Sequence, residues 1–234
     1  MLISPVKITG TKMMTRKITL AALLLLLPLL TRAQDDNFGL WGSLELKYGL
    51  SKKIDLLGSG SVRTTGTSRI DETFAEAGIQ YSFSKYLAAS FAYRLADRYE
   101  DDASYYFRHR LSAAVKTSLP VNRFTFSGRL MFQRTTKTYI EDDSDLDARY
   151  VGRLKVKSYY NIPSCPLNPY IYAEIFVPVN NGSGFTSSKN RFSAGAELKI
   201  NRHNSLEMEY IFQRDYLPHL TDKNIISVSY NFKF

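Results

Sequence analysis

Cysteine and long apolar runs are scarce in this 234-residue sequence, and each scarcity excludes a class of structure. Cys165 is the only cysteine, so the chain is not a disulfide-stabilised secreted domain. It also lies far from residue 34, so that position offers no cysteine for a lipid anchor. Beyond Ala33 no window approaches the run of about 18 apolar residues that marks a transmembrane helix. We therefore expect no membrane-spanning helix in the mature chain.

The net charge of the chain is also small once the N-terminal segment is set aside. The formal net charge is +9, but residues 1–33 hold five basic residues and no acidic one. Their removal leaves 26 Lys and Arg against 22 Asp and Glu, a net charge of +4. This balance gives no compositional support for a nucleic-acid partner, and we predict none.

The first 33 residues have the organisation of a secretory signal peptide. Arg16 and Lys17 precede the apolar segment 18–30, and Thr31-Arg32-Ala33 offers a small-residue cleavage site. The apolar segment is shorter than the roughly 20 residues of a spanning helix. Because Met13 or Met14 could be the true start, we interpret residues 1–12 as an upstream extension. The prediction is a removed segment 1–33 and one domain, 34–234.

From Phe38 onward, stretches of alternating apolar and polar residues recur, separated by turns. Alternation with a period of two is typical of β-strands that have one apolar face and one polar face. The candidate strands are approximately 38–48, 53–63, 70–83, 86–98, 106–119, 123–135, 147–160, 168–178, 189–200, 204–215 and 224–234.

Strand length favours a membrane barrel over a soluble sandwich, because the strands are long enough to cross a bilayer when tilted. Only a closed barrel satisfies every backbone group of a sheet in lipid, so the apolar faces must point outward. We predict an all-β fold, a single antiparallel transmembrane β-barrel of 10–12 strands. Such barrels normally have an even number of strands, whereas the candidates number eleven. Either 38–48 is not a full wall strand, therefore, or one strand is missing from the count.

Loop lengths predict the orientation of this barrel. The shorter connections near residues 84–85, 120–122, 162–167 and 201–203 are assigned to the periplasmic side. The longer connections 99–105, 136–146, 180–188 and 216–223 are assigned to the outside.

The inward faces carry most of the charge. We expect two lumen-facing groups: basic Arg94, Arg98, Arg108, Arg110, Arg129, Arg149, Arg153, Lys155 and Lys157, and acidic Glu76, Glu174, Glu197, Glu207 and Glu209. A closed barrel would set a basic wall opposite an acidic one. One interpretation is a narrow channel that favours small anionic solutes. The other is a structural barrel whose charges pair across the lumen and plug it.

Several segments resemble the outer-membrane β-barrel family catalogued as domain of unknown function 2490. They are Phe38-Gly39-Leu40-Trp41, Tyr93-Arg94-Leu95, Arg108-His109-Arg110-Leu111, Asn161-Ile162-Pro163-Ser164-Cys165 with Pro169-Tyr170, Asn201-Arg202-His203-Asn204-Ser205-Leu206, and Tyr230-Asn231-Phe232-Lys233-Phe234. The resemblance spans nearly the whole mature chain. It implies a barrel in the outer membrane of a Gram-negative bacterium but no activity.

The last strand also resembles the ends of outer-membrane barrels. Tyr230, Phe232 and Phe234 fall on one face, and such an aromatic ending implies a signal for the outer-membrane assembly machinery. We expect that machinery, membrane lipid and lipopolysaccharide as partners of a monomeric protein. An adaptor that binds a protein partner through its loops is a further alternative.

Two weaker patterns point to other chemistry. His203 and Ser205 are two residues apart and share a strand face, as a lipid acyl hydrolase could require, although the turn that holds them explains the pair without catalysis. Asp143, Asp145 and Asp147 are similar to the start of a calcium loop but lack its turn glycine and its distal glutamate. We therefore predict a protein that is not an enzyme and has neither a cofactor nor a bound metal.

Overall fold

The structure is a computed structural model that describes residues 37–66, 69–100, 104–138, 148–179, 186–217 and 219–234. The predicted signal segment 1–33 lies outside the described residues. No helix of membrane-spanning length and hydropathy occurs among those residues that are described.

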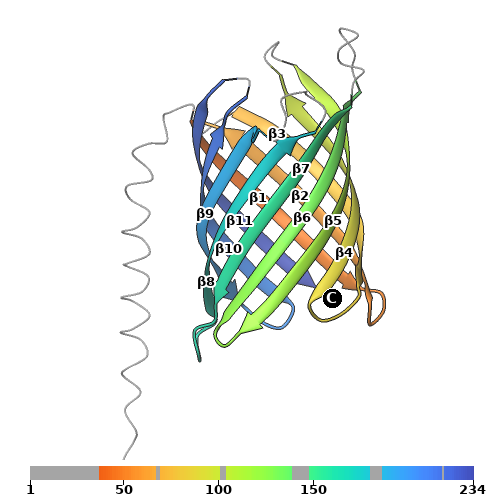
Figure 1. The fold of residues 1–234 in the computed structure, drawn as a ribbon. Helices are drawn as coiled ribbons and strands as arrows, with labels where there is room; N and C mark the ends of the chain where they lie inside the picture. The colour runs from red at the N-terminus through yellow and green to blue at the C-terminus, as the bar shows by residue number, and fades with distance from the viewer. Residues whose placement is uncertain (1–36, 67–68, 101–103, 139–147, 180–185, 218) are drawn as a thin grey trace, which may run out of the picture.

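Eleven β-strands make up the fold (Figure 1). They are β1 (Phe38–Gly49), β2 (Ile54–Thr65), β3 (Arg69–Ser82), β4 (Leu87–Tyr99), β5 (Tyr105–Val121), β6 (Phe124–Lys137), β7 (Arg149–Tyr160), β8 (Leu167–Pro178), β9 (Lys189–Lys199), β10 (Asn204–Asp215) and β11 (Thr221–Lys233). Every strand predicted from the sequence is confirmed, with bounds that shift by a few residues at most.

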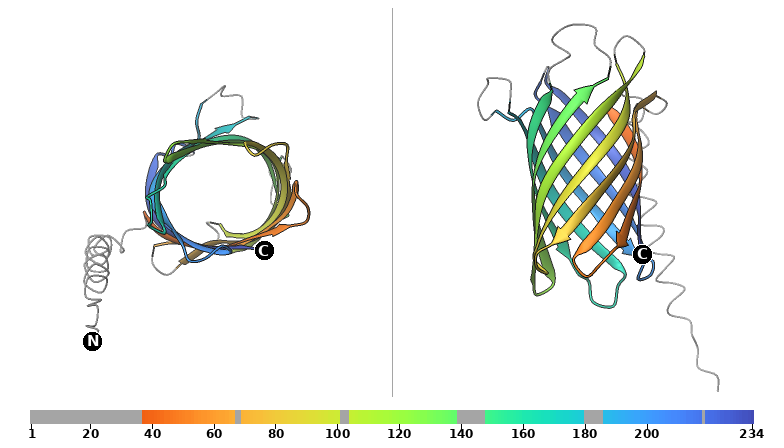
Figure 2. Two further views of the ribbon diagram at one scale, coloured as in Figure 1. Left: turned by 90° about the horizontal axis from the view of Figure 1, so that it is seen from below. Right: turned by 90° about the vertical axis from the view of Figure 1, so that its right-hand side faces the viewer.

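The strands close into one barrel, which appears as a single ring when viewed along its axis (Figure 2). Neighbours in sequence pair antiparallel, whereas β1 and β11 pair in parallel, from Phe38 opposite Asn224 to Lys47 opposite Lys233. Each hairpin reverses the chain direction, so the first and last of an odd number of strands run the same way. The predicted all-β barrel of 10–12 strands is confirmed, and its antiparallel pairing has one exception, the parallel β1–β11 seam.

The seam also resolves the strand number, which the sequence left between ten and twelve. β1 pairs along its length with both β2 and β11. The suggestion that residues 38–48 do not form a full wall strand is therefore wrong. The described residues form a barrel of eleven wall strands.

The connections predicted for one side of the barrel share one end, and those predicted for the other side share the opposite end. Residues 50–53, 83–86, 122–123, 161–166 and 200–203 connect strands at one end, which we call the short-turn end, where the chain also terminates (Figure 1). At the opposite end, β1 begins and the connections include 100–104, 138–148, 179–188 and 216–220. We call this the long-loop end.

Burial in this barrel is inverted relative to a soluble protein. Leu130 and Ile171 on the outer surface are each 63% exposed, whereas Glu174 in the interior is 2% exposed. Many of the other buried residues are polar as well, among them Gln133, Ser193 and Gln213, although Ile211 and Ile225 are buried too. An apolar outside around a polar inside is the pattern of a transmembrane barrel, in which lipid covers the outer face.

Candidate functional site in the barrel lumen

Three cavities follow the lumen. One of about 520 Å³ opens toward the long-loop end, and we call it the outer cavity. Two more, of about 660 and 840 Å³, lie toward the short-turn end, and we call them the inner cavities. Glu76, Arg94, Arg129 and Met131 line both the outer cavity and the larger inner cavity, so these four side chains lie at the boundary between the two.

The structure places the charged residues predicted for the lumen inside the barrel. Those that line the outer cavity are Glu76, Arg94, Arg98, Arg108, Arg110, Arg129, Arg149 and Arg153. Those that line the inner cavities include Lys155, Lys157, Glu197 and Glu207. Glu174 accepts hydrogen bonds from Arg129 and Arg153, and Glu209 accepts them from Tyr170 and Ser193.

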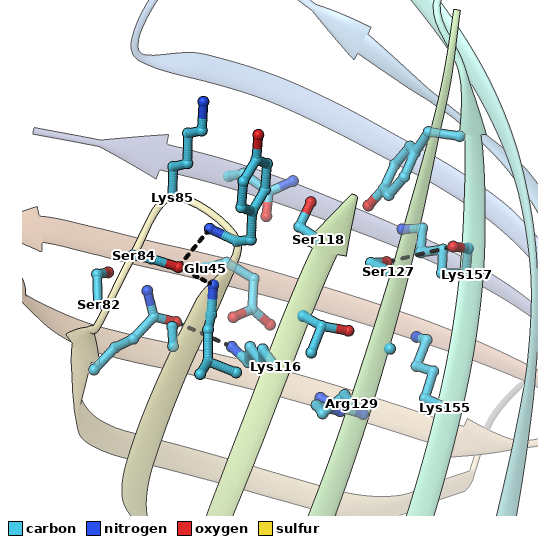
Figure 3. Close-up of a pocket in the computed structure, with 18 of the residues that line it drawn as sticks. Glu45, Ser82, Ser84, Lys85, Lys116, Ser118, Ser127, Arg129, Lys155 and Lys157 are labelled. Carbon is cyan, nitrogen blue, oxygen red and sulfur yellow. Dashed lines mark hydrogen bonds between the residues drawn. The ribbon is translucent and has the colours of Figure 1, made fainter. Parts of the chain in front are cut away.

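The basic residues form rows across neighbouring strands because their positions are in register. Lys116 on β5 is opposite Arg129 on β6, which is opposite Lys155 on β7. These three side chains project into the same inner cavity (Figure 3). Nearer the long-loop end, a second row contains Arg94, Arg110, Thr135 and Arg149. A basic surface therefore extends along β4–β7 through both halves of the lumen.

The acidic residues of the smaller inner cavity come from the other side of the ring. Glu45 is on β1 and Glu207 is on β10, on either side of β11. In the strand order, β6 is separated from the β1–β11 seam by the same number of strands in each direction. The basic surface therefore faces the seam and its flanking carboxylates across the lumen.

The ion pairs run along the wall. Arg63 bonds Glu72 at 2.9 Å and Arg94 bonds Glu76 at 2.8 Å, both between adjacent strands. Within the part of the chain that the structure describes, the ion pair that reaches furthest around the ring joins Lys157 on β7 to Glu207 on β10, at 3.3 Å. Among the described residues, no ion pair joins diametrically opposite strands. The cross-lumen pairing required by a plugged barrel is therefore not seen in this part of the chain.

Glu174 organises the largest charge cluster. Its carboxylate lies 2.8 Å from Arg129, 2.7 Å from Arg153 and 3.8 Å from Arg191. The three arginines come from β6, β7 and β9, on both sides of β8. A single buried acid thus holds three guanidinium groups against the wall, and the cluster keeps an excess of positive charge.

Sequence reasoning missed several lumen residues, of which Arg63 and Trp41 are the most informative. The guanidinium groups of Arg63 and Arg191 lie over the Trp41 ring, at 4.2 and 4.9 Å from its centroid. Arg63 shares its strand face with Ser59 and Ser61, and strict alternation along β2 would have identified it. The small residues of β2 concealed that alternation.

The structure places His203 in the turn between β9 and β10 and Ser205 at the start of β10. The His203 ring nitrogen Nδ1 lies 2.7 Å from the backbone oxygen of Lys233, to which it can donate. Asn201 accepts hydrogen bonds from the backbone of His203 and Asn204 and so closes the turn. Both candidates border the larger inner cavity, but no hydrogen bond joins them among the described residues.

The other predicted sites lie elsewhere. Asp143, Asp145 and Asp147 fall outside the described residues, and no metal-binding group of His, Cys, Asp or Glu occurs within them. At the chain end, Tyr230 and Phe234 are exposed on the outer face, and the Phe232 and Phe234 rings pack at 4.4 Å. Their role in membrane assembly stays a prediction.

Comparisons with known proteins agree with this architecture. A family model described as "Protein of unknown function (DUF2490)" matches residues 38–224. A solved structure of the NanC porin is similar with a TM-score of 0.55 and 12% identity, covering 84% of this chain and 97% of that one. The β domain of the Bordetella autotransporter Brka has a TM-score of 0.49 and 12% identity, covering 81% and 87%. No curated protein sequence matches. At these identities the likeness concerns the fold alone.

Proposed function

Given that this chain belongs to the DUF2490 family of proteins of unknown function, we propose that it is an outer-membrane channel that favours small anions. The apolar outer surface supports a position in a membrane, and the predicted signal segment supports export. With the usual orientation of such barrels, the short-turn end faces the periplasm and the long-loop end faces outward.

The observation that carries the proposal is the charge around the outer cavity. Eleven Lys and Arg residues line it, against four Asp and Glu residues. Because the ion pairs follow the wall, the charged side chains need not fill the centre of the lumen. A passage with an excess of fixed positive charge lowers the energy of an anion within it and raises that of a cation.

Planar-bilayer recording of the refolded protein tests this proposal. We expect steady current and a reversal potential displaced toward that of chloride in a potassium chloride gradient. The displacement should shrink at about 1 M salt, where the Debye length falls to about 3 Å. A cation-selective current would overturn the proposal. So would silence, and phospholipid cleavage that Ser205→Ala abolishes would then identify a hydrolase instead.

Two neighbouring arginines provide a matched pair of variants. Arg149 lines the outer cavity, whereas Arg134 on the adjacent strand is exposed on the outer face. Both substitutions by Gln remove one positive charge at a similar height. Arg149→Gln should lower the chloride preference, and Arg134→Gln should leave it unchanged. Equal effects would show that lumen charge does not set the selectivity.

A further inference from the structure

The arginines of the outer cavity fall into two groups according to their partners. Arg63, Arg94 and Arg153 each bond a carboxylate on a neighbouring strand. Arg98, Arg110 and Arg149 have no carboxylate within ion-pair distance among the described residues. These three lie together on β4, β5 and β7, toward the long-loop end.

Arg110 is the most constrained of the unpaired group. Its Nε donates to the Thr135 hydroxyl oxygen at 3.2 Å, from the position directly opposite on β6. This bond uses the inner donor of the guanidinium group and leaves both terminal nitrogens without an ion-pair partner. This hydrogen bond orients the planar guanidinium group of Arg110, whose two terminal nitrogens border the cavity.

The surroundings of Arg110 are unfavourable for an isolated cation. Arg94 is directly opposite on β4, and Arg149 continues the same row beyond Thr135. Nearby, Arg108 bonds Glu100, yet its buried Nε has no hydrogen-bond partner. Like charges in a partly buried site cost free energy unless a counter-charge offsets them. Glu72 and Glu76 lie near enough to interact electrostatically with Arg110, but among the described residues neither forms an ion pair with it. Its terminal nitrogens are thus left available to an anionic solute.

We propose that Arg110, oriented by Thr135 and flanked by Arg98 and Arg149, binds the carboxylate or phosphate group of the permeating solute. A planar guanidinium fork matches the two oxygens of such a group with two parallel hydrogen bonds, whereas a chloride ion offers only one acceptor atom. The channel is then a pathway for small organic anions, with chloride as a weakly bound substitute. This inference rests on the proposed channel function and specifies its solute class.

The test combines chloride current with calorimetry on the intact refolded protein. Added inorganic phosphate or succinate should reduce the chloride current in a saturable manner and should release a measurable heat of binding. Arg110→Lys keeps the charge but loses the fork, so it should retain the chloride preference and bind the oxyanion about tenfold more weakly or worse. Thr135→Val should weaken binding in the same direction.

The outer-face variant Arg134→Gln is the control and should bind both probes as the unmodified protein does. Binding of phosphate alone or succinate alone would support the site and narrow its solutes to phosphorylated compounds or carboxylic acids. Unchanged affinity in Arg110→Lys, or no binding of either probe, would overturn the inference. Because calorimetry needs no current, a protein that binds but does not conduct would refute the channel and leave the oxyanion site standing.

Discussion

Arg94 on β4 and Arg110 on β5 occupy directly opposed positions in their ladder, and both line the outer cavity. Arg94 bonds Glu76 at 2.8 Å, whereas Arg110 bonds only the neutral Thr135. Directly opposed like charges on one face of a sheet destabilise it. The pair therefore marks the place where this barrel keeps positive charge in the lumen against its own stability.

The Glu174 cluster predicts a large loss of stability in Glu174→Gln. This substitution would leave Arg129, Arg153 and Arg191 close together without an ionised partner. Removal of one partner of a buried ion pair costs about 3–5 kcal/mol in the free energy of unfolding. Urea-induced unfolding in detergent micelles, followed by fluorescence, would measure the loss. The surface pair Arg214–Asp222 provides the control, and Asp222→Asn should leave the unfolding midpoint unchanged. Equal midpoints for the two variants would contradict this account.

Gly195 on β9 is predicted to resist substitution because its lumen face lies close to β10. A Cβ atom at that position would be 2.6 Å from the Glu209 Cβ and from the Met208 backbone oxygen. Gly195→Ala should therefore destabilise the barrel by about 1–3 kcal/mol, as overpacking does elsewhere. Gly42, where nothing lies within 4 Å, supplies the control, and Gly42→Ala should unfold at the original urea concentration. A stable Gly195→Ala barrel would show that β9 and β10 are less closely apposed.

Trp41 should report solvent and ion access to the lumen, because it is the only tryptophan in the chain and lines the outer cavity. The guanidinium groups of Arg63 and Arg191 lie over its ring. Iodide should therefore quench its fluorescence more strongly than caesium, and the difference should diminish at high salt. Stern–Volmer titrations of the detergent-solubilised protein would measure both constants. A tryptophan insensitive to both ions would indicate a sealed lumen.

The parallel seam can be tested by crosslinking. The hydroxyl oxygens of Ser43 on β1 and Ser229 on β11 are 2.6 Å apart at opposed positions. In a Cys165→Ser background, Ser43→Cys with Ser229→Cys should form a disulfide under mild oxidation, seen as a mobility change on a non-reducing gel. Ser43→Cys with Ser227→Cys, two residues away on the same face of β11, should crosslink poorly. Efficient crosslinking only in the second pair would place the strands in another register.

The sequence was informative where the physical signal is local. The alternation of Ile226, Val228 and Tyr230 with Ser227 and Ser229 reflects lipid on one side and water on the other, and this contrast recurs in most of the strands. The alternation therefore predicted the candidate strands, and it predicted that Arg94 and Glu207 face the lumen. The turns between strands predicted which neighbours pair. Arg63 was not predicted to face the lumen because the Gly and Ser residues around it give β2 little hydrophobic contrast between its two faces.

Ring closure and charge pairing required the tertiary structure. The contact of Phe38 with Asn224 joins the two ends of the domain, and no local pattern encodes whether such a pair forms or in which direction it runs. The same holds for Glu174, whose three arginine partners come from strands on both sides of its own. Alternation by itself determined which side chains enter the lumen. Only closure of the barrel decided which of those charges pair with one another and which, like Arg110, have no ion-pair partner among the described residues, because pairing depends on distances between strands far apart in sequence.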